Sequence, residues 1–366
     1  MTQRTPRRRA PRATSARTPV TSEPAPPTAS PAGLELVEVR TLLSTSLEAR
    51  IPLAPGDLAL VEPGARFEAG DGLAELLRDG RTVETASRSG QDGAAEVRPG
   101  DRWTGPIARR GRRGRAGAEI HGEALYALDG RWRIAAGEVV DRIEAPGPGT
   151  VGQIHPGSAM TFRFDGRALP GAAAFGTPVR GRLEIAARPD GEIRAGAIDV
   201  RHRGTILVVG ARVDAEALTR ARAIGVRGVI VAGLAGKERR DLLASGERQQ
   251  AGRHRLEPFA ILDLDGTLRR PIAAAQMDVF RALAGAEVAI LVDPPALLVD
   301  ASTALPAPGP AAVRIRSGPR AGEEGTWAGL AGSQRFAAGV QCEAARVTLR
   351  DGSTAIVPLA DLERFA

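Results

Sequence analysis

Cysteine is almost absent from this chain of 366 residues, which contains only Cys342. A single cysteine excludes an internal disulfide and any metal site built from several thiolates. The four histidines, His121, His155, His202 and His254, are scattered along the chain. We therefore expect no metal and no cofactor. We also expect a cytoplasmic location, because a reducing compartment tolerates one unpaired thiol.

Lysine is equally scarce, because Lys237 is the only one beside 49 arginines. With alanine and glycine so abundant, this imbalance is typical of a coding bias toward G and C, and it excludes chemistry that needs a lysine elsewhere. No stretch approaches the roughly 18 uninterrupted apolar residues of a membrane span, and no apolar stretch follows the basic start as it does in a signal peptide. We therefore expect no membrane insertion.

Apolar residues make up 43% of the chain and charged residues 25%, which fits a globular protein of two or three domains. The formal net charge of +7 suggests a nucleic-acid partner, but the positive charge is local. Residues 1–33 hold six arginines against one glutamate, and residues 102–115 hold six arginines and no acidic residue. The rest of the chain carries −4.

Residues 1–33 combine arginine and proline with almost nothing apolar to bury, which predicts a disordered tail of polyproline character. Two interpretations of this tail stay open. It can be an electrostatic tether to RNA, DNA or acidic lipid, or a simple solubilising extension.

From residue 34 to residue 200, short stretches of alternating apolar and polar residues are separated by Pro-Gly and Asp-Gly pairs. This pattern predicts many short strands in a sandwich or barrel. Residues 51–80 and 143–183 share a rhythm of strand, Pro-Gly turn and strand, most clearly at 145–151 and the following His155-Pro156-Gly157. The rhythm resembles the two halves of a barrel-sandwich hybrid, the fold of lipoyl and biotinyl carriers. Since no lysine precedes Lys237, such a domain would serve structure or docking and could not carry a prosthetic group.

The insert between these halves contains a second basic run, which consists of Arg109, Arg110, Arg112, Arg113 and Arg115. So many like charges cannot share a packed surface, so we expect an exposed loop. Arg-Gly runs can follow a nucleic-acid backbone, although no aromatic residue is interleaved between Trp103 and Tyr126. Phosphate binding and a solvated loop between strands are the two interpretations.

Residues 201–300 alternate buried strands with helices. The expected strands are 204–210, 226–231, 259–264 and 288–292, and the expected helices are 214–224, about 237–250 and 273–283. Asp214 is the expected N-cap of the first helix. This alternation predicts βαβ units and a small, largely parallel α/β domain.

The third expected strand of this domain ends in Asp263-Leu264-Asp265-Gly266-Thr267, which resembles the first motif of haloacid-dehalogenase-type phosphatases. The resemblance would make Asp263 the phosphoryl-accepting nucleophile and Asp265 a general acid/base. The family's downstream lysine is missing, and Asp293 and Asp300 do not form its later acidic pair. We therefore favour a core strand followed by an Asp-Gly turn, with no catalytic residue.

Open α/β sheets bind ligands beyond the carboxyl ends of their strands. By that analogy, a pocket in this domain would be lined by Lys237, Asp265, Arg269 and Arg270. The alternative for these four residues is ordinary surface ion pairing.

A Pro-rich linker at 301–311 leads to a C-terminal module at 312–366. Within residues 312–327, strand residues that alternate between apolar and polar lead to the pattern Gly-Pro-x-x-Gly-x-x-Gly. Further strands are expected at 345–349 and 354–357. This module resembles a KOW motif in an SH3-like barrel. KOW modules contact RNA or protein partners, so the resemblance implies binding rather than catalysis.

If RNA is the ligand, the resemblance implies phosphate contacts from Arg314, Arg316 and Arg320 and a stacking face from Trp327 or Phe336. Trp327 can equally be packed inside the barrel, and the acidic and basic residues of the module nearly balance. A protein partner therefore fits the module as well as RNA does.

The sequence thus predicts a multidomain α+β protein with a disordered N-terminal tail (1–33), a β-rich barrel-sandwich-like domain (34–200), a small parallel α/β domain (201–300) and a C-terminal SH3-like β-barrel (312–366). The expected function is that of a non-enzymatic interaction protein, an accessory factor of nucleic acid, the ribosome or transcription. The alternatives are a small-ligand-binding or enzymatic α/β domain, and a scaffold subunit of a larger protein complex.

Overall fold

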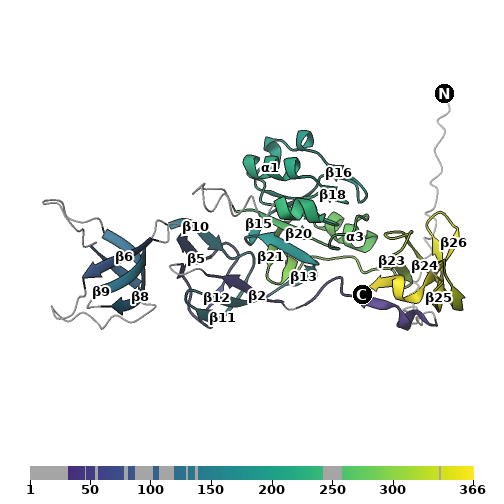
Figure 1. The fold of residues 1–366 in the computed structure, drawn as a ribbon, viewed down its shortest axis with the longest axis horizontal. Coiled ribbons are helices and arrows are strands. Elements are labelled where there is room, and N and C mark those ends of the chain that lie inside the picture. Colours follow the sequence, from purple (N-terminus) through teal and green to yellow (C-terminus); the bar gives the residue numbers. More distant parts are fainter. Residues whose placement is uncertain are drawn as a thin grey trace, which may run out of the picture.

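The computed structural model describes residues 32–45, 47–53, 57–77, 81–86, 102–106, 119–128, 131–136, 139–241, 258–337 and 339–366. Over these residues the fold is strand-rich, with several sheets and few helices. Figure 1 shows the sheets in a row along the long axis, with the helices gathered at the central one and the C-terminus near the last. The tail expected at 1–33 lies outside the described residues up to residue 31.

Two small antiparallel sheets build a first core from two separate stretches of chain. One contains β10 (Val139–Glu144), β5 (Gly72–Leu77) and β3 (Leu58–Ala59), and the other contains β2 (Leu47–Pro52), β12 (Ala159–Phe164), β11 (Gly149–His155) and β4 (Arg66–Phe67). In the core, the ring of Phe67 meets those of Phe162 and Phe164 edge to face, with centroids 5.6 and 5.7 Å away. The two stretches with the shared turn rhythm therefore interleave, while their likeness to a barrel-sandwich hybrid stays a prediction.

A four-stranded antiparallel sheet is inserted between β5 and β10. Its order is β6 (Arg81–Ala86), β9 (Arg131–Ala136), β8 (Glu119–Leu128) and β7 (Arg102–Pro106). The second basic run lies between β7 and β8, outside the described residues. Its phosphate-binding role therefore stays a prediction.

The central sheet has eight strands and crosses the boundary expected at residue 200. Its order is β13 (Arg167–Pro170), β22 (Pro295–Val299), β21 (Glu287–Val292), β15 (Val179–Ile185), β17 (Thr205–Val208), β19 (Gly228–Val231), β20 (Ala260–Asp263) and β14 (Ala173–Gly176). The four strands from β15 to β20 are parallel neighbours, as expected for βαβ units, and the remaining pairs are antiparallel.

The strand β21 differs from the expected parallel arrangement. Ile272, just before helix α3 (Ala274–Ala282), donates its backbone N–H to Pro189 beyond the carboxyl end of β15, and β21 then begins opposite Arg182. Helix α3 and strand β21 therefore run one after the other in the same direction, and this direction is opposite to that of β15. The other well-defined helix, α1 (Ala215–Ile224), is capped by Asp214, whose Oδ1 accepts from Ala217 N at 2.6 Å, as the sequence predicted.

Both edges of the central sheet come from one chain segment, because β13 and β14 are consecutive. The chain turns between them at Gly171, whose N–H donates to Pro295 O, and Ala172 N–H then donates to Asp263 O. A Cβ at Gly171 would lie 2.5 Å from a methyl of Leu262 and 2.8 Å from the carbonyl oxygen of Asp263. This bend wraps the sheet toward a closed barrel.

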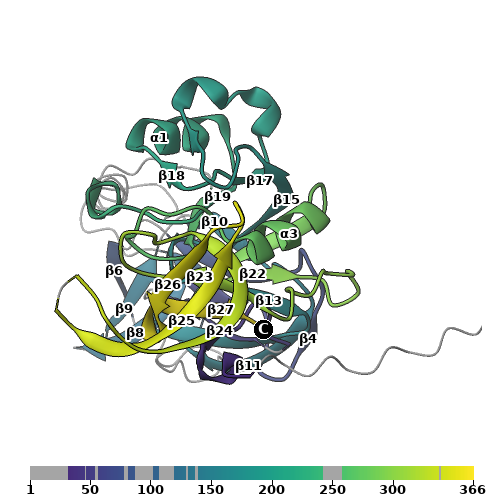
Figure 2. The ribbon, with the colours of Figure 1, turned by 90° about the vertical axis from the view of Figure 1, so that its right-hand side faces the viewer.

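The C-terminal sheet contains the strands expected for the KOW-like module, which are labelled β23 to β27 in Figure 2. It also contains a strand from near residue 40. Its order is β1 (Glu38–Arg40), β27 (Leu362–Phe365), β23 (Ala312–Ile315), β24 (Glu324–Arg335), β25 (Gln341–Leu349) and β26 (Thr354–Pro358). Leu34 and Val37 pack with Trp327 in its core, and β1 runs parallel to β27. Residues 34–40, which the expected boundaries gave to the β-rich domain, therefore pack with the C-terminal sheet, while the SH3-like barrel stays a prediction.

Candidate functional site

A buried cluster of charged side chains joins the central sheet to the C-terminal sheet. The carboxylate of Asp265, which follows β20, is fully buried. It pairs with Arg40 of β1, and its Oδ2 lies 2.8 Å from Nη2 of Arg314 and 3.5 Å from Nε of Arg270. Arg314 also lies 3.3 Å from Glu363 of β27. We call these five residues the Asp265 cluster.

The charges of the cluster set the protonation of its central carboxylate. Burial raises the pKa of Asp265, but the charges of Arg314, Arg40 and Arg270 and the hydrogen bond from Arg314 outweigh burial and leave the pKa lowered. Asp265 is therefore ionised at neutral pH. It balances the guanidinium groups of Arg40 and Arg314, which are remote along the chain, and of Arg270, which is five residues away.

Asp263, the last residue of β20, shapes the turn that places Asp265. Its Oδ1 accepts the backbone N–H of Gly266 at 2.8 Å and that of Asp265 at 3.2 Å. Burial raises the pKa of Asp263 to about 6, the amide N–H groups of Gly266, Leu234 and Asp265 oppose this rise, and the Asp265 charge adds to it. These contacts are those of the Asp-Gly turn that the sequence favoured.

The two aspartates lack the access that phosphoryl transfer needs. A carboxylate nucleophile must approach phosphorus in line, so one of its oxygens needs an open face. Asp263 is only 3% exposed, and Asp265 is enclosed by arginines of its own chain. This geometry supports a structural role for both residues of the motif.

Of the four residues expected to line a pocket at the strand ends, the structure brings two together. Arg270 lies beside Asp265 and donates to the main-chain oxygen of Arg316 at 2.7 Å, so it ties the two sheets to each other. Lys237 and Arg269 are exposed.

Most of the residues expected to contact RNA in the C-terminal module form ion pairs or pack against other residues of the same chain. Arg314 belongs to the Asp265 cluster, Arg316 pairs with Glu38, and Arg320 lies 3.2 Å from Glu323. Trp327 is 5% exposed and packs in the core, where its Nε1 donates to Ala32 O at 3.3 Å. Of the two alternatives for Trp327, the structure shows the packed one.

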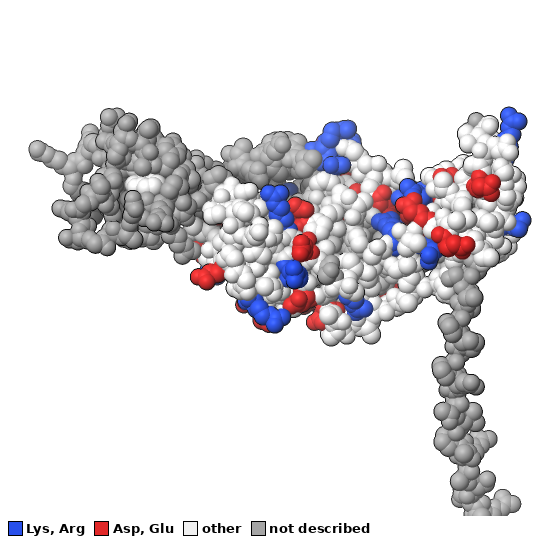
Figure 3. Space-filling view, turned by 90° about the horizontal axis from the view of Figure 1, so that it is seen from below, with Lys and Arg blue, Asp and Glu red and all other residues white. Residues whose placement is uncertain are grey.

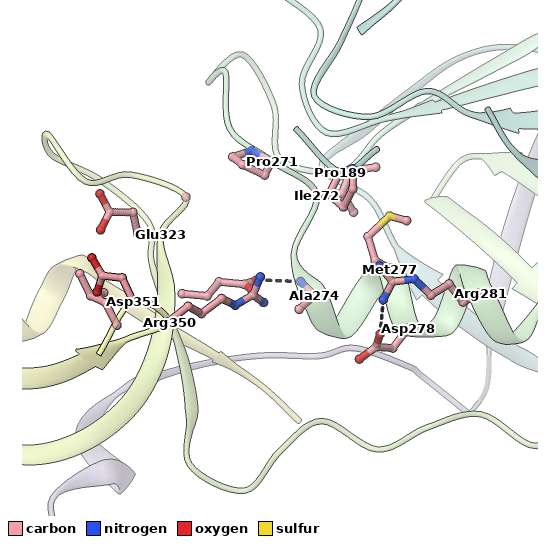
Figure 4. Close-up of a pocket in the computed structure, with 13 residues that line it drawn as sticks. Pro189, Pro271, Ile272, Ala274, Met277, Asp278, Arg281, Glu323, Arg350 and Asp351 are labelled. Atoms are coloured by element: carbon pink, nitrogen blue, oxygen red, sulfur yellow. Dashed lines mark hydrogen bonds and ion pairs between the residues drawn. The ribbon is translucent and has the colours of Figure 1, made fainter. Parts of the chain in front are cut away.

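A groove separates α3 from the C-terminal sheet and consists of two adjoining cavities. The larger, of about 530 Å³, lies between α3, the segment before it and residues 322–324 and 349–351 of the C-terminal sheet and its loops (Figure 4). The smaller, of about 350 Å³, extends toward β23, Phe365 and the linker at 307–309. Both cavities are lined by Ala274, Asp278, Glu324, Leu349 and Arg350.

Glu324 lies where the two cavities meet. Its Oε1 accepts the backbone N–H of Ala274, the first residue of α3, at 2.7 Å, and its other oxygen pairs with Arg350. Ala273, at the N-cap, has no side chain that could do this, so Glu324 supplies the negative group that a helix N-terminus favours.

Sequence reasoning missed four residues of these sites, namely Arg40, Glu324, Arg350 and Glu363. No local signal could have found them, because their partners are remote along the chain. Ala274 and Glu324, for example, are 50 residues apart.

Other indications of function are few. Among the residues that the structure describes, no group of three or more His, Cys, Asp or Glu side chains is placed to hold a metal ion. In the same part of the chain, no helix is long and apolar enough to cross a membrane. The chain matches no protein-family model and none of the curated proteins. Function must therefore be inferred from its own residues.

Proposed function

We propose that this chain is a non-enzymatic multidomain binding protein whose KOW-like C-terminal barrel binds a protein partner. The observation that carries the proposal is that four of the seven arginines of residues 312–366 face carboxylates of the chain. Arg316 pairs with Glu38, Arg320 with Glu323 and Arg350 with Glu324, while Arg314 is buried in the Asp265 cluster. A nucleic-acid surface needs cationic groups that are free to replace the counterions of phosphate. Arginines that already face carboxylates serve that purpose poorly.

The surface of the barrel supports the same conclusion. Val340, just before β25, is 58% exposed, and Ile356 of the edge strand β26 is 51% exposed. On the face seen in Figure 3, red and blue residues are intermixed over the described part rather than gathered by sign. Apolar contacts among mixed charges are typical of protein interfaces.

A second candidate is nucleic-acid binding through the insert. It is favoured by one observation, the six arginines of residues 102–115 with no acidic residue among them. Such a site would act independently of the C-terminal barrel, because the charges belong to a different part of the chain.

A pull-down of the full chain with and without nuclease separates the two candidates. A protein partner is retained after nuclease treatment, and its capture is weakened by Val340→Ser and Ile356→Ser but not by Val200→Ser, a matched change at an 81% exposed valine of the central unit. Capture that is lost after nuclease, or that disappears when the arginines at 109–115 become glutamine, would instead favour nucleic acid.

Two further points belong to this proposal. The barrel-sandwich-like unit serves as a docking or structural part, since it has no lysine for a prosthetic group. A cytoplasmic location rests on the single cysteine.

A further inference from the structure

The two edge strands of the C-terminal sheet differ in what they expose. One edge is β1, in which Glu38 and Arg40 are charged and both form ion pairs within the chain. The other edge is β26, which holds no charged residue and lies on the side of this sheet away from the central sheet (Figure 1). Edge strands avoid pairing with other chains through charged side chains, proline and short length. Of these features, β26 has only its short length and Pro358 at its end.

The hydrogen-bond register shows which backbone groups of β26 point out of the sheet. The carbonyl oxygen of Ser353, just before β26, accepts a backbone N–H of β25 at 2.8 Å. Hydrogen-bonded and non-hydrogen-bonded pairs alternate along antiparallel strands, so β26 bonds to β25 through every second residue, at Ala355 and Val357. The N–H and C=O groups of Thr354 and Ile356 therefore point away from β25.

These outward groups are available to another chain. Thr354 and Ile356 make no backbone hydrogen bond to any described residue outside the strand ladder. Both residues are exposed, Ile356 to 51%. Their two donors and two acceptors repeat at the two-residue spacing of a strand, which is the pattern that the backbone of an extended segment complements. The side chain of Ile356 adds a β-branched apolar contact for a residue placed beside it.

We propose that β26 binds an extended segment of the protein partner, which adds to the C-terminal sheet as a further strand. Thr354 and Ile356 each donate an N–H to this segment and each accept one from it, and an apolar side chain of the segment packs beside Ile356. Pro358, which has no N–H, limits the pairing at that end. The inference rests on the proposed function and deepens it, because it assigns recognition to main-chain hydrogen bonds as well as to apolar side chains.

Amide hydrogen exchange of the full chain, followed by NMR, tests this edge with the peptide acetyl-Lys-Thr-Val-Thr-Val-Lys-amide as the probe. In the free chain, the amides of Thr354 and Ile356 should exchange at least about tenfold faster than those of Ala355 and Val357, which are bonded to β25. Saturation with the peptide should slow Thr354 and Ile356 at least about tenfold and leave Ala355 and Val357 within about twofold. The same peptide with N-methyl groups on its four central residues cannot donate the bonds and should have no effect.

Two substitutions at one position separate backbone pairing from side-chain contact. Ile356→Pro removes an outward N–H but no bond of the sheet, and proline is found on edge strands where the N–H would face solvent. Ile356→Ala keeps the N–H and shortens the side chain. We expect Ile356→Pro to weaken peptide binding at least about tenfold, and Ile356→Ala to weaken it less than about threefold. If Ile356→Pro does not fold, Thr354→Pro makes the same test at the other outward N–H.

Equal effects of the peptide and its N-methylated form would overturn strand addition, as would unchanged exchange at Thr354 and Ile356 or equal weakening by Ile356→Pro and Ile356→Ala. Self-association of the chain in sedimentation that Ile356→Pro abolishes would also overturn it, because a second copy would then occupy the edge. The proposed function fails by a different result, namely that no protein partner is retained after nuclease treatment. A partner whose capture falls equally in Ile356→Pro and Ile356→Ala overturns only the strand addition and leaves that function standing.

Discussion

The two aspartates of the Asp-x-Asp motif should respond in opposite ways to the same substitution. Asp265→Asn removes the negative charge at the centre of the Asp265 cluster. Removing one partner of a buried ion pair typically destabilises a protein by about 3–5 kcal/mol, because the other charge is left buried without compensation. Arg40 is 24% exposed and can recover water, but Arg314, at 2%, cannot. We therefore expect Asp265→Asn to lower the free energy of unfolding by about 3–5 kcal/mol at pH 7.

Asp263→Asn should stabilise the protein at the same pH. Burial raises the pKa of Asp263 from 3.8 to about 6, so keeping this group ionised costs about 3 kcal/mol at about 1.4 kcal/mol for each pKa unit. An asparagine keeps the Oδ1 that accepts from Gly266 and Asp265. It loses the favourable contact of the carboxylate with the Leu234 amide, worth about 1 kcal/mol. The net expectation is a gain of about 1–2 kcal/mol.

The pH dependence of the free energy of unfolding also distinguishes the two aspartates. Because the folded pKa of Asp263 is raised, its contribution to stability is fully present below pH 3.8 and is lost as the pH rises through about 6. The advantage of Asp263→Asn over wild type should therefore shrink between pH 8 and pH 5. Asp265, with a lowered pKa, contributes stability that is present above pH 3.8 and lost only as the pH falls below that value.

Urea unfolding of the full chain, followed by circular dichroism at several pH values, measures the stability change of each variant and how that change depends on pH. Equal shifts of the same sign for the two variants would refute this reasoning, as would a neutral Asp265→Asn. A phosphatase site predicts loss of turnover in both variants and gives no reason for opposite changes in stability.

Three further substitutions test other contacts. Arg314→Met should destabilise the chain by about 3–5 kcal/mol alone but by much less in the Asp265→Asn background, and a double-mutant cycle in urea measures the difference. Leu34→Ala should lower the unfolding temperature of the C-terminal sheet in calorimetry, at a cost of about 2–5 kcal/mol, although this leucine is about 280 residues away from β23 along the chain. Gly171→Ala should cost about 1–3 kcal/mol by urea unfolding because its Cβ meets Leu262, whereas Gly196→Ala, with open space around it, should be nearly neutral.

Much of the local structure was predictable from short stretches of sequence. The N-cap at Asp214, the strands at 204–210, 226–231 and 259–264, and the Asp-Gly turn after β20 depend on residues a few positions apart. Hydrophobic periodicity and the residue preferences of turns both depend on residues a few positions apart along the chain. The strand-rich character of the chain followed from the same signals.

The charge of Asp265 illustrates what was not predictable. The motif around it suggested either catalysis or a turn, and only its surroundings separate these interpretations. Those surroundings are supplied by Arg40 and Arg314, which lie 225 and 49 residues away along the chain. Side chains so remote leave no trace in local composition, so the buried cluster could not be inferred.

Sequence alone predicted several strands, two helices and the turn after β20, and it excluded disulfides and a lysine-linked cofactor in the first 236 residues, while most of the helix expected at about 237–250 lies outside the described residues. Tertiary structure decided how these segments combine. It placed Leu34–Leu36 and β1 with the C-terminal sheet, brought both edges of the central sheet together at Gly171, and opened a groove between α3 and that sheet. The physical reason is that strand pairing and ion pairing join residues that are distant along the chain, whereas propensity and capping act between neighbours.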